Sequence, residues 1–427
     1  MTPRRRSQIS WALYDWANSA FATTVLAGFF PIFFNQYWAQ GVAPQTQTLY
    51  QGLTATVASL VVMLLAPWLG AIADRRAAKK DFLLAFTLLG VVSTAALYLV
   101  GKGQWGWAIA LSIAGRIGFF GGLSFYDALL VQVAQPREMD RVSALGYGLG
   151  YLGGGLLFAV NVAMALEPAW FGLADAALAT RVAFVSVALW WAVFALPLFR
   201  HVPEGAARSG STGWRELLET LKHIRELRAV WMFLLAYWLY IDGVDTIIVM
   251  AVDFGMKLGF ASDSLIVALL MVQFIGFPAA IAFGWLADRI GTRHAIYLAL
   301  AVYAAVTLWA YRLGSVTEFY LMAAAIGCVQ GGIQSLSRSY YARLIPAEKA
   351  GEFFGFYNMM GKFAAVLGPT VVGLTAQFTG SPRLAILSLL GFFIVGALLL
   401  ARVRDPLQAA GTPTGSPRPR SSADASR

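Results

Sequence analysis

The sequence predicts an all-α membrane protein with twelve transmembrane helices, arranged as two six-helix halves related by a pseudo-two-fold axis along the membrane normal. Composition, twelve apolar runs and an internal repeat lead to this prediction. Of 427 residues, 59% are hydrophobic and 13% are charged, and this charged fraction is about half that of a soluble protein. The composition argues against a soluble enzyme, a disordered protein and a disulfide-linked secreted scaffold.

The apolar runs are long enough to cross a bilayer, which needs about 20 residues of helix. A strand of a membrane barrel needs only about 10 residues, with apolar and polar side chains in alternation. The sequence shows no such alternation. We expect helical spans at 11–34, 50–73, 82–101, 105–135, 142–165, 181–199, 229–252, 264–287, 295–313, 319–342, 353–378 and 384–401.

These spans divide the chain into two halves, 1–200 and 229–404, with six spans in each. The stretch 201–228 between them has apolar residues at helical spacing and charged residues on the opposite face. We expect it to be a linker whose amphipathic helix lies on the cytoplasmic surface. The tail 405–427, rich in Pro, Ser, Gly and Thr, is predicted to be disordered.

The basic residues indicate the orientation of the chain. The N-terminus, every second loop and the tail hold 24 of the 32 Lys and Arg residues. By the positive-inside rule, both termini are expected in the cytoplasm. We therefore expect a multi-pass protein of a bacterial cytoplasmic (inner) membrane, with a vacuolar membrane as the alternative. The net charge of +10 is explained by orientation and anionic lipids, without nucleic acid.

The two halves share short sequence matches in the same order. GAIADRR at 70–76 corresponds to GWLADRI at 284–290. The glycine pair at 121–122 corresponds to that at 331–332, and the polar group Asp15, Asn18 and Ser19 corresponds to Asp242, Asp245 and Thr246. Each match lies at the same span of its half, which predicts a six-plus-six duplication.

The repeated loops also carry a resemblance to a known family. The loop at 70–80 resembles the signature loop of the major facilitator superfamily, and 284–293 resembles its second copy. The opening SWALYDWANSAFATT at 10–24 resembles the vacuole-effluxer branch, the autophagy-related amino-acid exporters, and its bacterial relatives. The resemblance implies a solute site at the midplane between the halves, lined by the first, fourth, seventh and tenth helices.

Charged residues inside the spans are candidates for that site, because a charge in hydrocarbon costs at least about 2.5–3.5 kcal/mol. Asp15 and Asn18 share one helix face, and so do Asp242 and Asp245. We expect the two pairs to face each other across the cavity and to bind a proton or a solute ammonium group. In the alternative interpretation, these acids only form structural ion pairs with Arg116 or Lys362.

Basic and neutral side chains complete the candidate site. Arg116 is predicted to bind a solute carboxylate, unless it pairs with Asp15. Lys362 is predicted to contact solute or to reach the cytoplasmic interface. The predicted substrate-binding or ion-coupling residues are Asp15, Asn18, Arg116, Asp242, Asp245, Gln330, Gln334, Asn358 and Lys362.

A second set of charged residues is predicted to form a cytoplasmic gate. Asp74, at a helix end, is expected to pair with an arginine and to cap a neighbouring helix N-terminus, which closes the cytoplasmic side. Asp127 and Arg338 are placed near the cytoplasmic ends of their spans, where they reach the interface or pair at the gate. The predicted gate residues are Asp74, Arg75, Asp127, Asp288, Arg289 and Arg338.

Two further groups are interpreted as structural. Trp11, Tyr14, Trp16 and Trp38 are predicted to be aromatic residues of the membrane interface rather than solute contacts. The glycine run at 146–155 is interpreted as a close helix-packing surface, because small residues recur at three, four and five positions.

The predicted function is secondary active transport of a small polar solute, an amino acid or similar zwitterion, by alternating access. Proton coupling is one option. The alternatives are an exporter of drugs or other hydrophobic cations and, from another class, a transporter-like sensor or an intramembrane enzyme. One Cys and three separated His argue against a metal centre. The sequence shows no nucleophile with a neighbouring base, so nothing in it favours an enzyme. We expect no cofactor, no nucleic acid, and a monomer in the bilayer.

Overall fold

The computed structural model describes residues 2–207 and 227–403. In these ranges it has twelve helices long and apolar enough to cross a membrane, which agrees with the prediction. The first half contains α1 (Pro3–Ala20), η1 (Phe21–Phe29), α2 (Phe30–Phe33) and η2 (Phe34–Trp38) in the first span, then α3 (Pro44–Arg76), α4 (Lys79–Ala96) with η3 (Leu97–Leu99), α5 (Trp105–Ala128) with α6 (Leu130–Val133), α7 (Met139–Leu166), η4 (Pro168–Phe171) and α8 (Ala176–His201).

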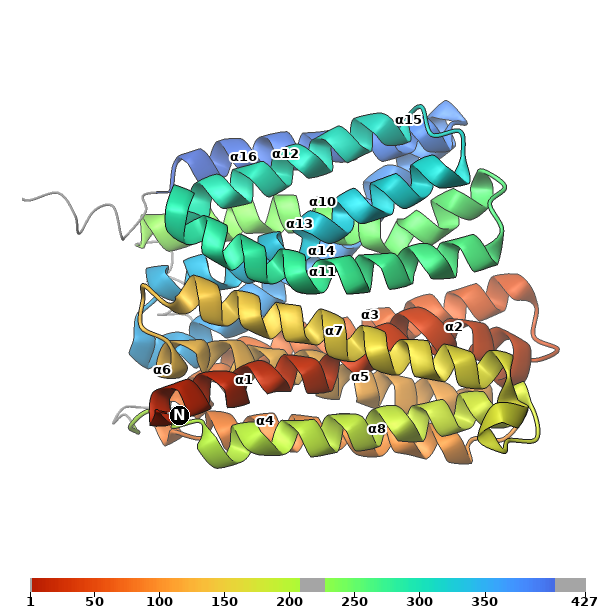
Figure 1. The fold of residues 1–427 in the computed structure, drawn as a ribbon, viewed down its shortest axis with the longest axis horizontal. Helices are drawn as coiled ribbons and strands as arrows, with labels where there is room; N and C mark the ends of the chain where they lie inside the picture. Colours follow the sequence, from red (N-terminus) through yellow and green to blue (C-terminus); the bar gives the residue numbers. More distant parts are fainter. Residues whose placement is uncertain (1, 208–226, 404–427) are drawn as a thin grey trace, which may run out of the picture.

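The second half repeats this arrangement of six spans. It contains α10 (Arg228–Lys257), α11 (Ser262–Ile290), α12 (Thr292–Ala310), α13 (Val316–Leu344), η5 (Ala347–Lys349), α14 (Ala350–Thr379), and α15 (Pro382–Leu387) followed by α16 (Leu389–Ala401). Figure 1 shows the halves as two groups of helices, with α7 and α11 side by side where they meet. Further contacts between the halves are made by α3 with α14.

The first span begins earlier than predicted. Helix α1 starts at Pro3, eight residues before the apolar run, because Thr2 caps it and Pro3 occupies its first turn. The polar residues of this turn are helical although they are not apolar, and a prediction from hydrophobicity misses them. From Phe21 the span becomes π-helical over nine residues, a wider form that is rare and frequent at functional sites.

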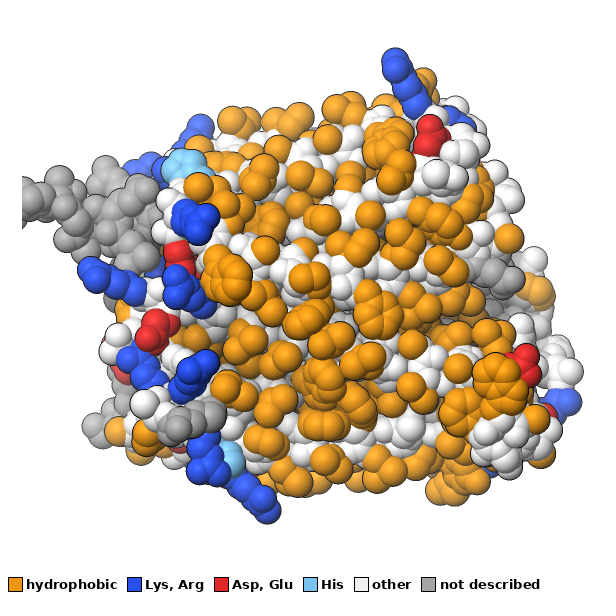
Figure 2. Space-filling view, viewed as in Figure 1, with side chains coloured by type: hydrophobic (Ala, Val, Ile, Leu, Met, Phe, Trp, Pro, Cys, Tyr) orange, Lys and Arg blue, Asp and Glu red, His pale blue; other side chains and the backbone are white. Residues whose placement is uncertain are grey.

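Charge is distributed unevenly between the two ends of the bundle. Figure 2 shows Lys and Arg gathered at the end where α1 begins, and hydrophobic side chains over the sides of the molecule. We call this end, which carries Arg4, Arg141 and Arg289, the basic end, and the other the far end. The end of the described chain lies there too, since Arg293 donates to the carbonyl of Val403.

Aromatic residues of the first span lie inside the bundle. Trp11 and Trp38 are fully buried and Tyr14 is 1% exposed. Their polar atoms have partners: Trp11 Nε1 donates to the Tyr126 carbonyl, 2.9 Å away, and Trp38 Nε1 to the Val100 carbonyl. The prediction of an interface position for these three is wrong, because this span packs against other helices instead of lipid.

The glycine run of α7 permits close contact with α1. A Cβ at Gly150 would lie 2.6 Å from Ser19 Oγ, and one at Gly153 would lie 2.6 Å from Trp16 Cδ2. Both distances are too short for any side chain larger than hydrogen. The geometry therefore agrees with the interpretation of this run as a packing surface.

The predicted amphipathic helix of the linker and the predicted disordered tail lie outside the described residues, apart from 201–207 and 227–228 of the linker. The start of the linker is attached to the first half. Glu204 accepts the backbone N–H of Lys80, 3.1 Å away, and Lys80 Nζ donates to the Val202 carbonyl.

Candidate functional site: a cavity between the halves

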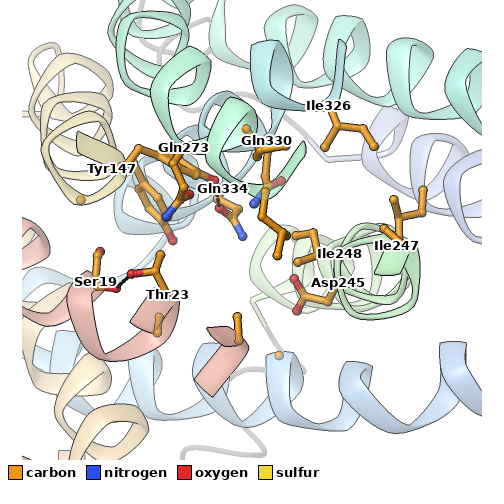
Figure 3. A pocket seen from close by; sticks show the side chains of 18 of the residues that line it. Ser19, Thr23, Tyr147, Asp245, Ile247, Ile248, Gln273, Ile326, Gln330 and Gln334 are labelled. Atoms are coloured by element: carbon orange, nitrogen blue, oxygen red, sulfur yellow. Dashed lines mark hydrogen bonds between the residues drawn. The ribbon is translucent and has the colours of Figure 1, made fainter. Parts of the chain in front are cut away.

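A cavity of about 470 Å³ lies between the two halves. The first half lines it with α1, η1, α5 and α7, and the second half with α10, α11, α12, α13, α14 and α15. Figure 3 shows Ser19, Thr23 and Tyr147 on one side, and Asp245 and Gln330 on the other. Its polar lining residues are Asp15, Asn18, Ser19, Thr23, Asp127, Tyr147, Tyr151, Tyr237, Asp245, Gln273, Thr307, Gln330, Gln334, Arg338, Tyr357, Asn358 and Lys362.

Seven of the nine residues predicted to bind substrate or an ion line this cavity: Asp15, Asn18, Asp245, Gln330, Gln334, Asn358 and Lys362. Asn18 is 2% exposed, and its Nδ2 has no hydrogen-bond partner in the described part of the chain. Gln334 accepts a hydrogen bond from Tyr151 OH at 3.1 Å. The structure therefore brings most of the predicted residues together around one cavity. Their role in binding stays a prediction.

Lys362 and Asp245, both of the second half, are two of the charged residues that line the cavity. The Lys362 ammonium lies 3.1 Å from the centre of the Phe120 ring, a cation–π contact. It interacts electrostatically with Asp245. Lys362 thus lines the cavity and does not extend to the interface, because the Phe120 ring and the Asp245 carboxylate hold its charge inside.

Asp242 does not line the cavity, so the predicted facing of two acidic pairs is wrong. Its side chain points to α14, where Oδ1 accepts the backbone N–H of Gly368 at 2.8 Å and a hydrogen bond from Thr246. Gly368 precedes Pro369 within the helix, and a proline disturbs the regular helical hydrogen bonds. Asp242 therefore binds the backbone of α14 directly before its internal proline.

Arg116, predicted to bind a solute carboxylate, is also absent from the cavity lining, and the alternative interpretation, in which it pairs with Asp15, is wrong. Its Nε contacts Ser112 Oγ, one turn away on the same helix, at 3.3 Å. The Asp15 carboxylate contacts a different arginine, Arg338 of the second half, at 3.2 Å. The arginine that lines the cavity together with Asp15 is thus Arg338, which was predicted to be a gate residue.

Arg338 is buried, with 1% exposure, and bridges the halves. Its Nη1 contacts Asp127 at 3.1 Å and its Nη2 contacts Asp15 at 3.2 Å. Its Nε donates to Ser143 Oγ at 2.9 Å, and Nη2 also donates to the Ser143 carbonyl. Asn358 donates to the other oxygen of Asp127. Of the two alternatives predicted for Arg338 and Asp127, reaching the interface is wrong, and the two residues pair with each other.

Gly146 lies against this cluster and offers a test of how tightly it is packed. A Cβ there would lie 2.6 Å from Asp15 Oδ2 and 3.1 Å from Arg338 Nη2. We expect Gly146→Ala to lower the free energy of unfolding by about 1–3 kcal/mol, as overpacking does. Gly52→Ala is the control, because a Cβ at Gly52 meets nothing within 4 Å. Equal thermal stability of the two variants in detergent would contradict this packing.

The basic end is closed by contacts between the halves. Asp74, at the end of α3, accepts the backbone N–H groups of Gly351 at 3.0 Å and Glu352 at 2.8 Å. These belong to the first turn of α14, whose partial positive charge favours a carboxylate. Asp74 also pairs with Lys79 at 2.5 Å. The expected cap of a neighbouring helix is present, but its partner cation is this lysine and not an arginine.

The second copy of the loop is less buried. Asp288 forms an ion pair with Arg141 of α7, whose side chain is 62% exposed. Arg289 is exposed, and Arg75 is half-buried near the end of α3. The two copies therefore contribute unequally to closing the basic end.

Two residues that the sequence did not single out also join the halves there. Asp140 of α7 pairs with Arg343 of α13 at 2.9 Å and accepts a hydrogen bond from Thr292 at 2.7 Å. Both charges lie next to the ends of spans, where they resemble ordinary orienting charges. No spacing in the sequence distinguishes them, since their contact depends on how the halves dock.

Two six-helix halves around a central cavity, closed at one end by polar contacts, define a transporter of the major facilitator superfamily type. The chain belongs to the vacuole effluxer Atg22 like family, whose model matches residues 3–406.

Similar proteins agree with this assignment. An uncharacterised MFS-type transporter, YxiO of Bacillus subtilis (strain 168), is 38% identical over 94% of this chain and 95% of its own length. Autophagy-related protein 22-1 of Penicillium rubens is 26% identical over 65% of this chain and 51% of its own. The crystal structure of the human organic anion transporter MFSD10 (TETRAN) superposes with a TM-score of 0.77, covering 94% of this chain and all of that one at 18% identity, which shows the shared fold. The chain is thus a transporter and not an enzyme.

Proposed function

We propose that this transporter moves an amino acid or similar zwitterion by alternating access of the cavity between halves 1–200 and 229–404. One observation carries the proposal: a basic residue, Lys362, and an acidic residue, Asp245, both line the cavity and interact electrostatically. A zwitterion offers the complementary pair of charges, its carboxylate to Lys362 and its ammonium group to Asp245. The unpartnered Asn18 Nδ2 adds a donor for a solute oxygen.

Asp245→Asn tests this assignment in liposomes that contain the purified protein. Losing a charged hydrogen bond of about 1.5–3 kcal/mol lowers solute uptake by about tenfold or more. Asp242→Asn, one turn earlier on the same helix, is the matched control, because its amide oxygen still accepts the Gly368 N–H. Uptake at the wild-type rate by the Asp245 variant removes Asp245 from the mechanism.

Hydrophobic organic cations are the second candidate class of solute. Phe119, Phe120, Phe254 and Phe319 line the cavity together with Asp245, and aromatic rings with a carboxylate bind such cations. A thermal-stability screen of amino acids, peptides, sugars and cations separates the two classes. Stabilisation by hydrophobic cations alone would favour this candidate.

We further propose that the basic end faces the cytoplasm of a bacterial inner membrane, with the transporter acting as a monomer. The positive-inside rule supports the orientation, and the bacterial relative supports the membrane. The contacts at the basic end then close the cytoplasmic side. Proton coupling belongs to the proposal as an option, and it predicts that a pH gradient across the liposome membrane drives uptake.

A further inference from the structure

The surroundings of Arg338 have the composition of a cation-binding site as well as of an ion pair. Its guanidinium carbon lies 4.7 Å from the centre of the Trp11 ring, 5.4 Å from that of Tyr126 and 4.4 Å from that of Tyr147. Trp11 and Tyr126 are themselves stacked, with centroids 4.5 Å apart. Rings around a cation in this manner form an aromatic cage, which recognises ammonium and guanidinium groups.

Two carboxylates complete the cage. Asp15 and Asp127 contact the guanidinium at 3.2 and 3.1 Å, and Tyr126 OH donates to Asp15 Oδ2 at 2.8 Å. Asp15 and Asp127 are 7% and 5% exposed. The guanidinium of Arg338 is thus a cation held by the chain itself in a site built for cations.

All walls of the cage belong to the first half of the protein. Trp11 and Asp15 lie on α1, Tyr126 and Asp127 on α5, and Tyr147 on α7. Arg338 lies on α13 of the second half. Alternating access requires the halves to separate at the basic end, and this movement withdraws the cation from a cage whose walls all belong to the other half.

Withdrawal leaves two buried carboxylates without a counter-ion, which is unfavourable. Asp15, Asp127 and Tyr147 line the cavity, so a cationic group of a solute in the cavity can reach the cage directly. Its binding there restores the lost charge pairing and stabilises the conformation with an open basic end.

We propose that the cage formed by Trp11, Asp15, Tyr126, Asp127 and Tyr147 is a second cation-binding site, occupied by Arg338 in the present conformation. It takes the ammonium or guanidinium group of the solute when the basic end opens. The inference rests on the proposed alternating access, but binding to the cage is measurable without any transport.

The test uses purified full-length Arg338→Ala protein and methylguanidinium chloride as the probe. The variant leaves the cage empty, so the probe is expected to raise its melting temperature in a saturable manner and to change the fluorescence of Trp11, which the Trp11→Phe change in the same variant removes. We expect a Kd about tenfold or more tighter than in the wild type, in which the cage is filled, since one desolvated cation–π contact is worth about that factor.

Arg343→Ala is the matched control, because it removes another arginine that bridges the halves and leaves the cage filled. Sodium chloride at equal ionic strength controls for salt. Stabilisation of the Arg338 variant no greater than that of the Arg343 variant would overturn the proposal. Loss of transport by Asp245→Asn bears on the proposed function and leaves this result untouched.

A double variant, Arg338→Ala with Asp127→Asn, serves if the single variant is recovered poorly. The double variant has one buried carboxylate without a counter-ion, where the single variant has two. It keeps the three aromatic rings and Asp15. Recovery of either variant only in the presence of methylguanidinium supports the cage. Failure of the probe to bind or to rescue both variants contradicts it.

Discussion

Arg338→Ala is expected to lower the free energy of unfolding by about 3–5 kcal/mol, the cost of removing one partner of a buried ion pair. The variant leaves Asp15 and Asp127 buried without their cation, because Arg338 contacts both. The free energy of unfolding of Arg338→Lys should lie between those of Arg338→Ala and the wild type. An ammonium keeps the charge but lacks the planar set of donors that reaches both acids and Ser143. Thermal and denaturant unfolding in detergent measure both variants.

An exposed ion pair between the same halves provides the control. Arg141 contacts Asp288 and its side chain is 62% exposed, so Arg141→Ala should cost no more than about 1 kcal/mol. Because both ion pairs join the two halves, a difference between the two variants reports the effect of burial. If the Arg338→Ala and Arg141→Ala variants have the same free energy of unfolding, the buried ion-pair cluster stabilises the protein no more than the exposed pair does.

The number and placement of the spans were predictable because the bilayer requires long apolar helices, whatever their tertiary contacts. The residues at which helices begin and end in polar segments were less predictable. The capped turn at Thr2 and Pro3 carries no apolar signal. Short matches such as those around Asp74 and Asp288 predicted the duplication, since repeated folds keep their positions in each half.

Which face of a helix meets the cavity was only partly predictable. Residues three apart on a helix point about 60° from each other, as 3.6 residues make a turn. Asp242 and Asp245 therefore share a broad face, yet a modest rotation of α10 places Asp245 in the cavity and turns Asp242 onto Gly368. The sequence gives the spacing but not this rotation.

Pairing across the halves was the least predictable feature. Arg338 and Asp15 are 323 positions apart, and neither has a spacing that points to the other. Arg116, Lys362 and Arg338 are equivalent in the sequence as basic residues within spans. Docking of α13 against α7 selects Arg338, and the aromatic rings that surround it come from three separate helices.

Asp74→Asn is expected to shift the protein towards a conformation with an open basic end. The amide retains one acceptor oxygen, so only one of the two N–H groups of Gly351 and Glu352 keeps its bond, and Lys79 loses its counter-ion. Hydrogen bonds to a charged group are worth about 1.5–3 kcal/mol each, so the ratio of open to closed molecules should rise by about tenfold or more.

Spin labels at Arg76→Cys and Ala347→Cys, in a Cys328→Ser background, report the distance between the halves at the basic end, since both positions are exposed. The Asp74 variant should gain a population at longer distance. Asp288→Asn is the matched control in the second copy of the loop: its partner Arg141 is exposed, so the change should remain below about fivefold. Equal, small shifts in the two variants would mean that capping of α14 by Asp74 does not hold the basic end closed. A larger shift for Asp288→Asn would assign that role to the second loop.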